Sequence, residues 1–498
     1  MQPVDLLETP TSIAISPVER EQRRCSPPGA SRQGDGRSEC RRDRDRILYA
    51  SSFLRLARVT QVITSAPESI LVQNRLNHSL RVAQISRSIA ENLLRDSSGR
   101  DVIVQLGGLD ADAAEAAGLA HDIGHAPFGH AGEVVLDEVA RVDLGLPEGF
   151  EGNAQTFRIA TKVECRNGMY DGLDLTRATR AALLKYPWLR LRAPETHLNA
   201  NHLSARKWDK FNAYDSEEDD LVDARSFLPA GFDDTQSLEA SIMDAADDIT
   251  YAVHDLEDFI MAQKIDLFAV REDLHALAEG KNRREEFEQA IEGWTSSYED
   301  YFDSHQLEHA ARIVIESLKT LPKRFDGSFD DVAAVRETFS RLIGKYVGQV
   351  RLPHDYISPA PLWRGGPFVA LDVEAWHEVQ ILKLLTKSEV VARTDVAVLQ
   401  RGQQELLKAL IALLREWKDS KSDFKRIPRR LREQIDLIRQ IADGQITPGT
   451  RRPSRPRRGA EERAILDYLC TLTDGQCGHL YRSLSGASSP TIAGAFAV

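Results

Sequence analysis

The stretch His121-Asp122-Ile123-Gly124-His125-Ala126-Pro127-Phe128-Gly129-His130-Ala131-Gly132-Glu133 directly follows an apolar, alanine-rich segment at residues 113–120. It places three histidines and two carboxylates in one short polar run. Imidazole nitrogens and carboxylate oxygens are both ligands of divalent cations, and histidine exchanges protons near neutral pH. The run therefore predicts a metal site with proton-transfer groups beside it, rather than a packed core.

Composition limits the class of protein. The 498 residues, of which 42% are hydrophobic, are enough for two or three domains or for one large helical body. The net charge of −12 gives no general attraction to nucleic acid, which would need a local basic patch. The five cysteines are scattered and odd in number, which argues against a disulfide framework. Because no apolar run reaches about 20 residues and no secretory pattern is present, we expect a cytoplasmic protein without membrane contact.

The chain divides into three parts. Residues 1–40 are rich in Ser, Pro, Gly and Arg and show no apolar period, so we expect a disordered tail. From residue 41 onward apolar residues recur at spacings of three and four, and no series of strands is evident. We therefore predict an all-α fold with a helical core at 41–265 and a helical C-terminal region at 266–498. A basic loop at 445–460 contains prolines that exclude a helix.

A helix is predicted over residues 237–262. Its apolar residues fall three and four apart and form one stripe, while Asp247, Tyr251 and Asp255 share the opposite face. This face either is solvated or lines a site. Met243 and Tyr251 lie one turn to either side of Asp247 and are poor neighbours for water, which favours a helix buried on both sides.

A metal shell can be assembled around Asp247 from other helices. His121 and Asp122 are adjacent at the expected end of a helix, just before Gly124, and His78 opens an earlier amphipathic helix. Two imidazoles and two carboxylates suit Mn²⁺ or Mg²⁺, with Fe²⁺, Zn²⁺ or Co²⁺ as alternatives. A single His-Asp pair recurs by chance, and a lone histidine is more often a capping or core residue. The hypothesis of a metal site therefore depends on the four residues occurring together, in order along the chain and on separate helical segments.

This ordered set resembles the HD phosphohydrolase superfamily, and the surrounding sequence is similar to its deoxyguanosine triphosphate triphosphohydrolase (dGTPase) branch. The similarity is dense from about residue 41 to residue 258, with a weaker echo at Asp467-Tyr468 and Thr473-Asp474. The stretches that carry it are Arg42 to Tyr49 with Thr60-Gln61-Val62, Asn74 to Leu80, His121 to Glu133, Gly149 to Gln155 and Met243 to Tyr251.

The resemblance implies a reaction. Such enzymes hydrolyse a deoxynucleoside triphosphate, here most simply dGTP, to the deoxynucleoside and inorganic triphosphate by attack at the α-phosphorus. It also implies that His78, His121, Asp122 and Asp247 are metal ligands. The catalytic residues would be His130, with Glu133 as its partner, and His125 above the phosphates. From the residues alone, His130 could equally be a helix-start residue bonded to a backbone carbonyl.

The resemblance also implies substrate contacts. Gln61 and Arg75 match positions at the base, the sugar or the phosphates, and Tyr251 and Asp255 match positions at the deoxyribose. A tyrosine ring packed against the 2′ carbon would exclude a hydroxyl group. Two further residues, Lys207 and Lys210, could neutralise the outer phosphates, although a solvated loop is the simpler interpretation of each lysine. Gly152 departs from the family pattern, in which a histidine is common at this position. The loop therefore offers no second histidine acid, and His125 and His130 are the histidines left for proton transfer.

Partners and alternatives complete the prediction. The resemblance implies a homo-oligomer and, for some relatives, modulation by single-stranded DNA or by a nucleotide effector. The basic loop could contact such DNA or could only aid solubility. Two other functions stay open: another HD-type nucleotide phosphodiesterase, and a regulatory protein that senses deoxynucleotides. The presence of both His130 and Glu133 argues against the second.

Overall fold

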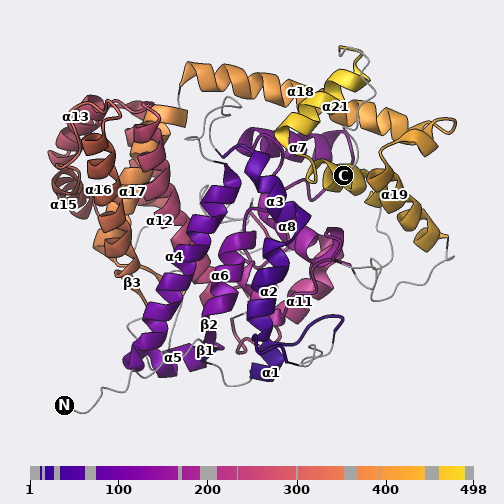
Figure 1. Cartoon of the computed structure of the whole chain (residues 1–498), viewed down its shortest axis with the longest axis horizontal. Coiled ribbons are helices and arrows are strands. Elements are labelled where there is room, and N and C mark those ends of the chain that lie inside the picture. The colour runs from indigo at the N-terminus through magenta and orange to yellow at the C-terminus, as the bar shows by residue number, and fades with distance from the viewer. Residues whose placement is uncertain are drawn as a thin grey trace.

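The regular structure of this chain is almost entirely helical (Figure 1). The computed structural model describes residues 12–13, 17–26, 34–61, 74–166, 171–190, 210–232, 234–298, 301–352, 367–391, 393–443 and 459–487. Strands among these residues are limited to two antiparallel pairs, β1 (Ser12–Ile13) with β2 (Leu109–Asp110) and β3 (Val350–Arg351) with β4 (Ala370–Leu371). The prediction of an all-α fold is confirmed.

The helices fall into two groups along the chain. Those of the first group are α1 (Pro17–Arg20), α2 (Glu39–Leu48), α3 (Ser51–Arg55), η1 (Leu56–Arg58), α4 (Arg75–Arg95), η2 (Ser97–Gly99), α5 (Arg100–Gln105), α6 (Ala111–Ala120), α7 (His130–Val142), α8 (Gly152–Arg158), η3 (Ile159–Val163), α9 (Arg177–Ala182), η6 (Asp215–Glu217), α11 (Glu218–Arg225) and α12 (Leu238–Met261). Those of the second are α13 (Leu267–Ala278), α14 (Glu285–Ser297), α15 (Ser304–Ser317), α16 (Phe329–Val347), α17 (Val373–Thr386), η7 (Lys387–Val391), α18 (Thr394–Asp419), η8 (Phe424–Arg426), α19 (Arg429–Ala442), α20 (Ala460–Leu469) and α21 (Asp474–Leu484).

Three helices, α4, α6 and α12, form the centre of the molecule. Each begins at a polar residue whose side chain accepts a hydrogen bond from a backbone N–H of the first turn. These caps are Asn74, Asp110 and Ser237. Helix α6 is buried along its whole length, so its alanines pack against helices on every side. Most of the predicted apolar stripe of α12 is buried as well, in one cluster with apolar residues of α4 and α6.

Gly118 allows α4 and α6 to approach closely. A Cβ atom at this position would lie 2.6 Å from the Cα atom of Ala83 on α4, closer than real side chains come. Any larger residue would push the two helices apart. Since His78 lies on α4 and His121 directly follows α6, this contact sets the distance between the first two predicted metal ligands.

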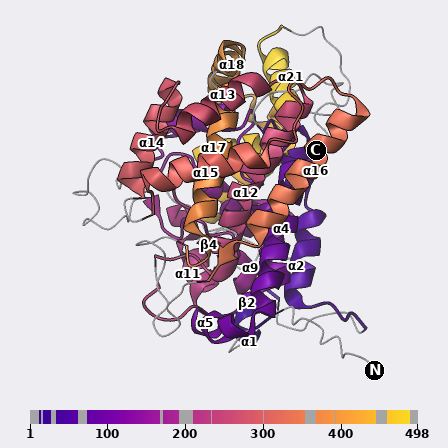
Figure 2. The same ribbon diagram turned by 90° about the vertical axis from the view of Figure 1, so that its left-hand side faces the viewer.

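The C-terminal region packs on both sides of this centre. Helices α13, α15, α16 and α17 gather beside α12, while α18 crosses the molecule and leads to α19, α20 and α21 (Figure 1). Figure 2 shows α14 and α15 on the outer side of the helices that gather beside α12. Leu407 and Leu410 of α18 and Leu466 of α20 share one apolar cluster with Ile123 and Phe128 of the predicted site segment. The C-terminal helices therefore support the segment that carries the site.

Buried charges also join α20 to the core. Arg158 at the end of α8 forms an ion pair with Asp467 of α20 at 2.8 Å and another with Glu217 at 2.6 Å. Asp467 accepts further hydrogen bonds of 2.8 Å from Gln155 and Gln434. A buried carboxylate with this many donors holds three separate segments together.

The N-terminal residues that the structure describes make specific contacts with the core, whereas the disordered tail expected through residue 40 stays a prediction. The pair β1–β2 ties this segment to the start of α6. Buried Arg20 pairs with Glu239 of α12, and buried Arg23 pairs with Glu39 at 2.8 Å and with Asp43 at 2.5 Å. The composition of this segment suggests a tail, but its arginines neutralise buried carboxylates. The sequence pattern does not show these partners.

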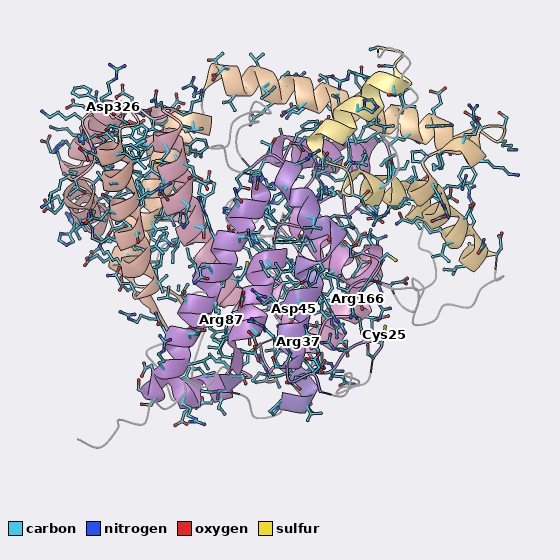
Figure 3. All side chains as sticks on the ribbon, in the orientation of Figure 1. Cys25, Arg37, Asp45, Arg87, Arg166 and Asp326 are labelled. Atoms are coloured by element: carbon cyan, nitrogen blue, oxygen red, sulfur yellow. The ribbon has the colours of Figure 1, made fainter. Side chains whose placement is uncertain are left out.

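Charged side chains cover the outer faces of the helices (Figure 3). Arg87 of α4, for example, pairs with Asp112 and Glu115 of α6, each at 2.7 Å. Among the described helices none is both long enough and apolar enough to cross a membrane. Two parts of the prediction, Lys207 and residues 445–458 of the basic loop, lie outside the described residues.

Candidate active site

The structure brings the ligand atoms of His78, His121 and Asp122 close enough to hold one ion, and Asp247 lies beside the two histidines. His78 lies in the first turn of α4, His121 and Asp122 directly follow α6, and Asp247 lies in the middle of α12. His78 Nε2 is 3.0 Å from Asp247 Oδ1, and His121 Nε2 is 3.4 Å from Asp122 Oδ1 and 3.7 Å from Asp247 Oδ1. Residues more than 160 positions apart along the chain thus converge on one point.

The donor set fits a divalent cation. His121 Nδ1 lies 2.8 Å from the carbonyl oxygen of Gly118, so this nitrogen carries the proton and the Nε2 lone pair faces the other three side chains. His121 Nε2 is buried and has no hydrogen-bond partner among the described residues. A backbone carbonyl that orients a histidine in this way is typical of metal ligands.

Three of the four groups have pKa shifts that suit a cation site, whereas at His78 burial lowers the pKa but the hydrogen bond to Asp247 outweighs it and raises the pKa. Burial lowers the pKa of His121, which favours the neutral imidazole that a metal requires. Burial raises the pKa of Asp247, but Lys185 and the two histidines outweigh it and lower that pKa below the usual range. Burial is likewise outweighed at Asp122, whose pKa is held well below its usual value by His121, His125 and Arg75. Two ionised carboxylates therefore face a shared point with a neutral imidazole.

Lys185 also belongs to this cluster, although no pattern in the sequence indicated it. Its ammonium group lies 2.6 Å from Asp244 Oδ1 and 3.4 Å from Asp247 Oδ2. Burial lowers the pKa of Lys185, but Asp244 and neighbouring groups raise it well above the usual value, so the side chain stays charged. A buried cation therefore lies directly beside the predicted metal ligands.

A second cluster forms where α7 begins. His130 is the first residue of α7, and Glu133 lies one turn later. The Nδ1–H group of His130 donates a 3.0 Å hydrogen bond to Glu133 Oε2. The side chain of His130 is 73% exposed, whereas that of Glu133 is buried against protein. The pair thus has a fixed, buried end and an accessible imidazole end, which leaves His130 Nε2 able to reach a bound molecule.

His125 connects the two clusters. Its Nε2 atom lies 2.9 Å from Asp122 Oδ1, and its Nδ1 atom forms an ion pair with Glu133 Oε1. Burial and Arg75 lower the pKa of His125, but Glu133 and Asp122 outweigh them and raise it to about 9. Both ring nitrogens face carboxylates, and the expected position of His125 above the phosphates stays a prediction.

The turn before α7 needs glycine. Phe128 and Gly129 have φ angles of 65° and 60°, a left-handed conformation that glycine adopts without strain. A Cβ atom at position 129 would lie 2.9 Å from Arg75 Nη2 and 3.0 Å from the carbonyl oxygen of Thr60. The turn thus brings the backbone against Arg75 and directs His130 toward the site.

Gly152, which departs from the family pattern, leaves space that Glu133 uses. A Cβ atom on Gly152 would lie 2.2 Å from Glu133 Oε1 and 3.5 Å from His125 Nδ1. Any side chain at position 152 would displace the carboxylate from its present place. The glycine therefore permits the Glu133–His125 ion pair in this chain.

Among the residues predicted to bind substrate, Arg75 and Gln61 are buried, and Arg75 contacts a predicted metal ligand. Arg75 donates from Nη1 to Asp122 Oδ2 at 2.7 Å and from Nε to the carbonyl oxygen of Thr60 at 3.0 Å. Gln61 follows Thr60, and its Oε1 atom has no hydrogen-bond partner among the described residues. Arg75 thus orients a predicted metal ligand, and its role toward substrate stays a prediction.

The other predicted substrate residues occupy different places. Tyr251 lies one turn after Asp247 on α12 and is half-buried. Asp255 is fully buried, and its Oδ1 atom is 3.9 Å from His78 Nδ1, so it lies behind a metal ligand. Lys210 pairs with Glu151 at 3.1 Å. It also lines an open pocket of about 430 Å³ together with His130 and Glu133.

Asp474 supports the site from the far end of the chain. Its Oδ1 atom accepts a 2.8 Å hydrogen bond from Phe128 N, and its Oδ2 atom accepts a 2.9 Å hydrogen bond from Thr60 N. One carboxylate of α21 thereby fixes the segment before His130 and the segment before Gln61. In the sequence, Asp474 belonged only to a weaker part of the family resemblance, and nothing indicated that it would bind these two backbone N–H groups.

Comparison with known proteins agrees with this geometry. The HD domain family model matches residues 75–252, a range that includes all four predicted metal ligands. A deoxyguanosinetriphosphate triphosphohydrolase-like protein of Corynebacterium efficiens is 32% identical over 468 residues, covering 91% of this chain and 93% of that protein. Proteins of the same description from Streptomyces coelicolor and Corynebacterium glutamicum are 30% and 37% identical, covering 91% and 73% of this chain and 93% and 74% of their own lengths.

The similarity to the relative from Corynebacterium efficiens extends over almost the whole of both chains, so it includes the C-terminal helices as well as the HD domain. The family resemblance inferred from the sequence is confirmed. This chain belongs to the deoxyguanosinetriphosphate triphosphohydrolase-like family of HD-domain proteins.

Proposed function

We propose that this protein hydrolyses a deoxynucleoside triphosphate, with dGTP as the preferred substrate, to the deoxynucleoside and inorganic triphosphate. The names of its relatives support this reaction. The observation that carries the proposal is the position of His125, which joins Asp122 of the metal-ligand cluster to Glu133 of the exposed His130 pair. A cation site and a proton-transfer pair that share one imidazole can act on the two ends of a single bond.

His78, His121, Asp122 and Asp247 would hold the divalent cation, and Mn²⁺ or Mg²⁺ is the proposed ion. When bound, such a cation polarises a phosphoryl oxygen and activates a coordinated water. Arg75 keeps the Asp122 carboxylate in place through its 2.7 Å hydrogen bond. Lys185 counters the charge of Asp244 and Asp247 and adds positive charge beside the site.

His130 is the proposed general acid for the departing 5′ oxygen. Its Nδ1 is held by Glu133, so Nε2 can carry the proton that the leaving group requires. Glu133 is in turn fixed by His125, which the carboxylates on either side keep positively charged. The pair is oriented before substrate binds, which reduces the reorganisation needed during the reaction.

Charge and shape complete the substrate proposal. Lys185 and Lys210 provide two cations for the triphosphate on either side of the histidine clusters. Tyr251, one turn from Asp247, is the proposed filter against ribonucleotides, because a ring packed on the 2′ carbon leaves no room for a hydroxyl group. We propose that Gln61, whose Oε1 atom has no partner among the described residues, contacts the base or sugar.

Product analysis tests the proposal. Metal-loaded protein is incubated with each of the four deoxynucleoside triphosphates and with cyclic nucleotides, and the products are separated by ion-exchange chromatography. Deoxynucleoside and triphosphate in equal amounts support the proposed reaction. Pyrophosphate, orthophosphate or cleavage of a cyclic nucleotide would instead indicate another member of the HD superfamily, and no turnover in any metal would favour a sensor.

Two variants separate the proposed roles. His121→Ala should lose bound metal and activity together, because a ligand is removed. His130→Ala should keep the metal and lose most of its turnover, because the ligands are intact and only the acid is missing. Metal content measured by plasma mass spectrometry distinguishes the two, and a His130→Ala protein without metal would contradict the assignment.

A further inference from the structure

A second cavity lies outside the site described above. Its volume is about 250 Å³, and it is enclosed by α3, η3, the start of α19 and the segment that enters α21. The lining residues that matter here are Ser52, Arg55, Glu164, Arg430, Thr473 and Gln476. None of them belongs to the metal-ligand cluster or to the His130 pair.

Arg55 is the central group of this cavity. Its guanidinium donates from Nε to the carbonyl oxygen of Leu472 at 2.6 Å and from Nη2 to the carbonyl oxygen of His125 at 2.9 Å. Its Nη1 atom is buried without a hydrogen-bond partner among the described residues, and the carboxylate whose charge acts on Arg55 is that of Asp474, with which it forms no ion pair. Buried arginines are almost always paired with an anion, since an isolated buried charge is costly.

Other groups of the cavity add to this positive character. Ser52 Oγ is also buried without a hydrogen-bond partner among the described residues. Arg430 brings a second cation, and Thr473 and Gln476 mark the N-terminal end of α21, where the helix dipole favours an anion.

One carboxylate, Glu164, lines the same cavity. It is engaged by the Ser51 hydroxyl at 2.8 Å and by the Ser52 backbone N–H at 2.9 Å. Two arginines, Arg55 and Arg430, and one carboxylate, Glu164, line the cavity. The lining therefore carries a net positive charge.

We propose that this cavity is a binding site for a small oxyanion of the phosphate class, held by Arg55 and Arg430. The volume is below the range of about 300–1,000 Å³ that is usual for drug-sized ligands, so the site suits a small inorganic anion better than a nucleoside triphosphate. The free Nη1–H and the Ser52 hydroxyl provide donors for its oxygens. Since Arg55 also holds the backbone of His125, the anion and the catalytic segment would share one guanidinium.

Selenate, a tetrahedral oxyanion with an anomalous signal, shows where the anion binds. Crystals of the full-length, metal-loaded protein are soaked in selenate, and an anomalous difference map is calculated. A peak within hydrogen-bond distance of Arg55 Nη1 is the expected result. Peaks confined to the Lys185 and Lys210 region, or to arginines on the surface, would overturn the proposal.

Phosphate titration by calorimetry tests the contribution of the second cation. Arg430→Met should weaken phosphate binding by about tenfold, because a charge-assisted hydrogen bond is lost. Arg429→Met is the matched control, since Arg429 precedes it on α19, is exposed, and does not line the cavity; its affinity should match that of the unaltered protein. Equal affinities for the two variants would overturn the proposal.

Phosphate that binds at the substrate site is recognised by a third variant. Lys210→Met removes a cation from the pocket beside His130 and leaves the second cavity intact. Phosphate affinity that is retained in Lys210→Met and reduced in Arg430→Met supports the proposal. The reverse pattern would place the anion at the substrate site.

Discussion

His125 Nε2 lies 2.9 Å from Asp122 Oδ1, while His125 Nδ1 is paired with Glu133. This single imidazole joins the metal-ligand cluster to the His130 pair. His125→Ala should therefore lower kcat by about 100-fold and keep the bound metal, because Glu133 loses the partner that fixes it while all four ligands remain. Steady-state kinetics and metal analysis of the same sample provide the check.

The matched control for this variant is His305→Ala, on an exposed position of α15. It should retain the activity of the unaltered protein. Full activity in His125→Ala would show that the link between the clusters has no part in turnover.

Tyr251 controls the choice of sugar in this account. Tyr251→Ala should reduce the preference for dGTP over GTP by about tenfold, since a cavity beside the 2′ carbon would admit a hydroxyl group. Tyr251→Phe keeps the ring and should keep the preference. The ratio of kcat/KM values for the two nucleotides measures the effect, and equal ratios in all three proteins would place the filter elsewhere.

Asp474 is predicted to be a positioning residue. An asparagine offers one acceptor oxygen, so Asp474→Asn would leave either Phe128 N or Thr60 N without its partner. The turn before His130 would loosen, and we expect kcat to fall about tenfold with metal content unchanged. Asp423→Asn, which alters a surface pair with Arg426, is the control and should be neutral. Unchanged kcat in Asp474→Asn would contradict the assigned role.

The buried carboxyl of Asp110 gives stability a dependence on pH. Burial raises the pKa of Asp110 to about 6, above its value in the unfolded chain. The folded state therefore holds the proton more tightly, and the stability that this provides is present below pH about 4 and is lost as the pH rises through about 6.

Asp110→Asn removes this titration while keeping an amide oxygen that can cap α6 at Ala113 N. The free energy of unfolding of the variant, relative to the unaltered protein, should increase by on the order of 2 kcal/mol between pH 4 and pH 7. Denaturant unfolding at both pH values measures it. A difference that is independent of pH would show that Asp110 is ionised in the folded state.

Much of the fold and of the metal cluster could be predicted because the signals are local. His78, His121 and Asp247 lie at helix ends or on one face of a long amphipathic helix, where a period of 3.6 residues shows which side chains share a face. On the polar face of α12, Asp255 is buried and Asp247 and Tyr251 are half-buried, so the face is only partly covered by other helices.

Other features depend on contacts that no local pattern shows. Lys185 meets Asp247 across 62 residues, and Asp474 meets Phe128 across 346 residues. The N-terminal arginines resemble a disordered tail until their buried partners, such as Glu239, are seen. The position of His125 between two carboxylates follows from the left-handed turn at Phe128 and Gly129, which the residue types permit but do not dictate.

Anomalous diffraction at the manganese edge would locate a bound cation among the histidine clusters. The ligand atoms of His78, His121 and Asp122 lie close enough to hold one ion, and so do those of His125, His130 and Glu133. In crystals soaked in Mn²⁺, we expect the strongest peak within bonding distance of His78, His121, Asp122 and Asp247. A strongest peak between His125, His130 and Glu133, or one that any of the four proposed ligands fails to reach, would contradict this expectation.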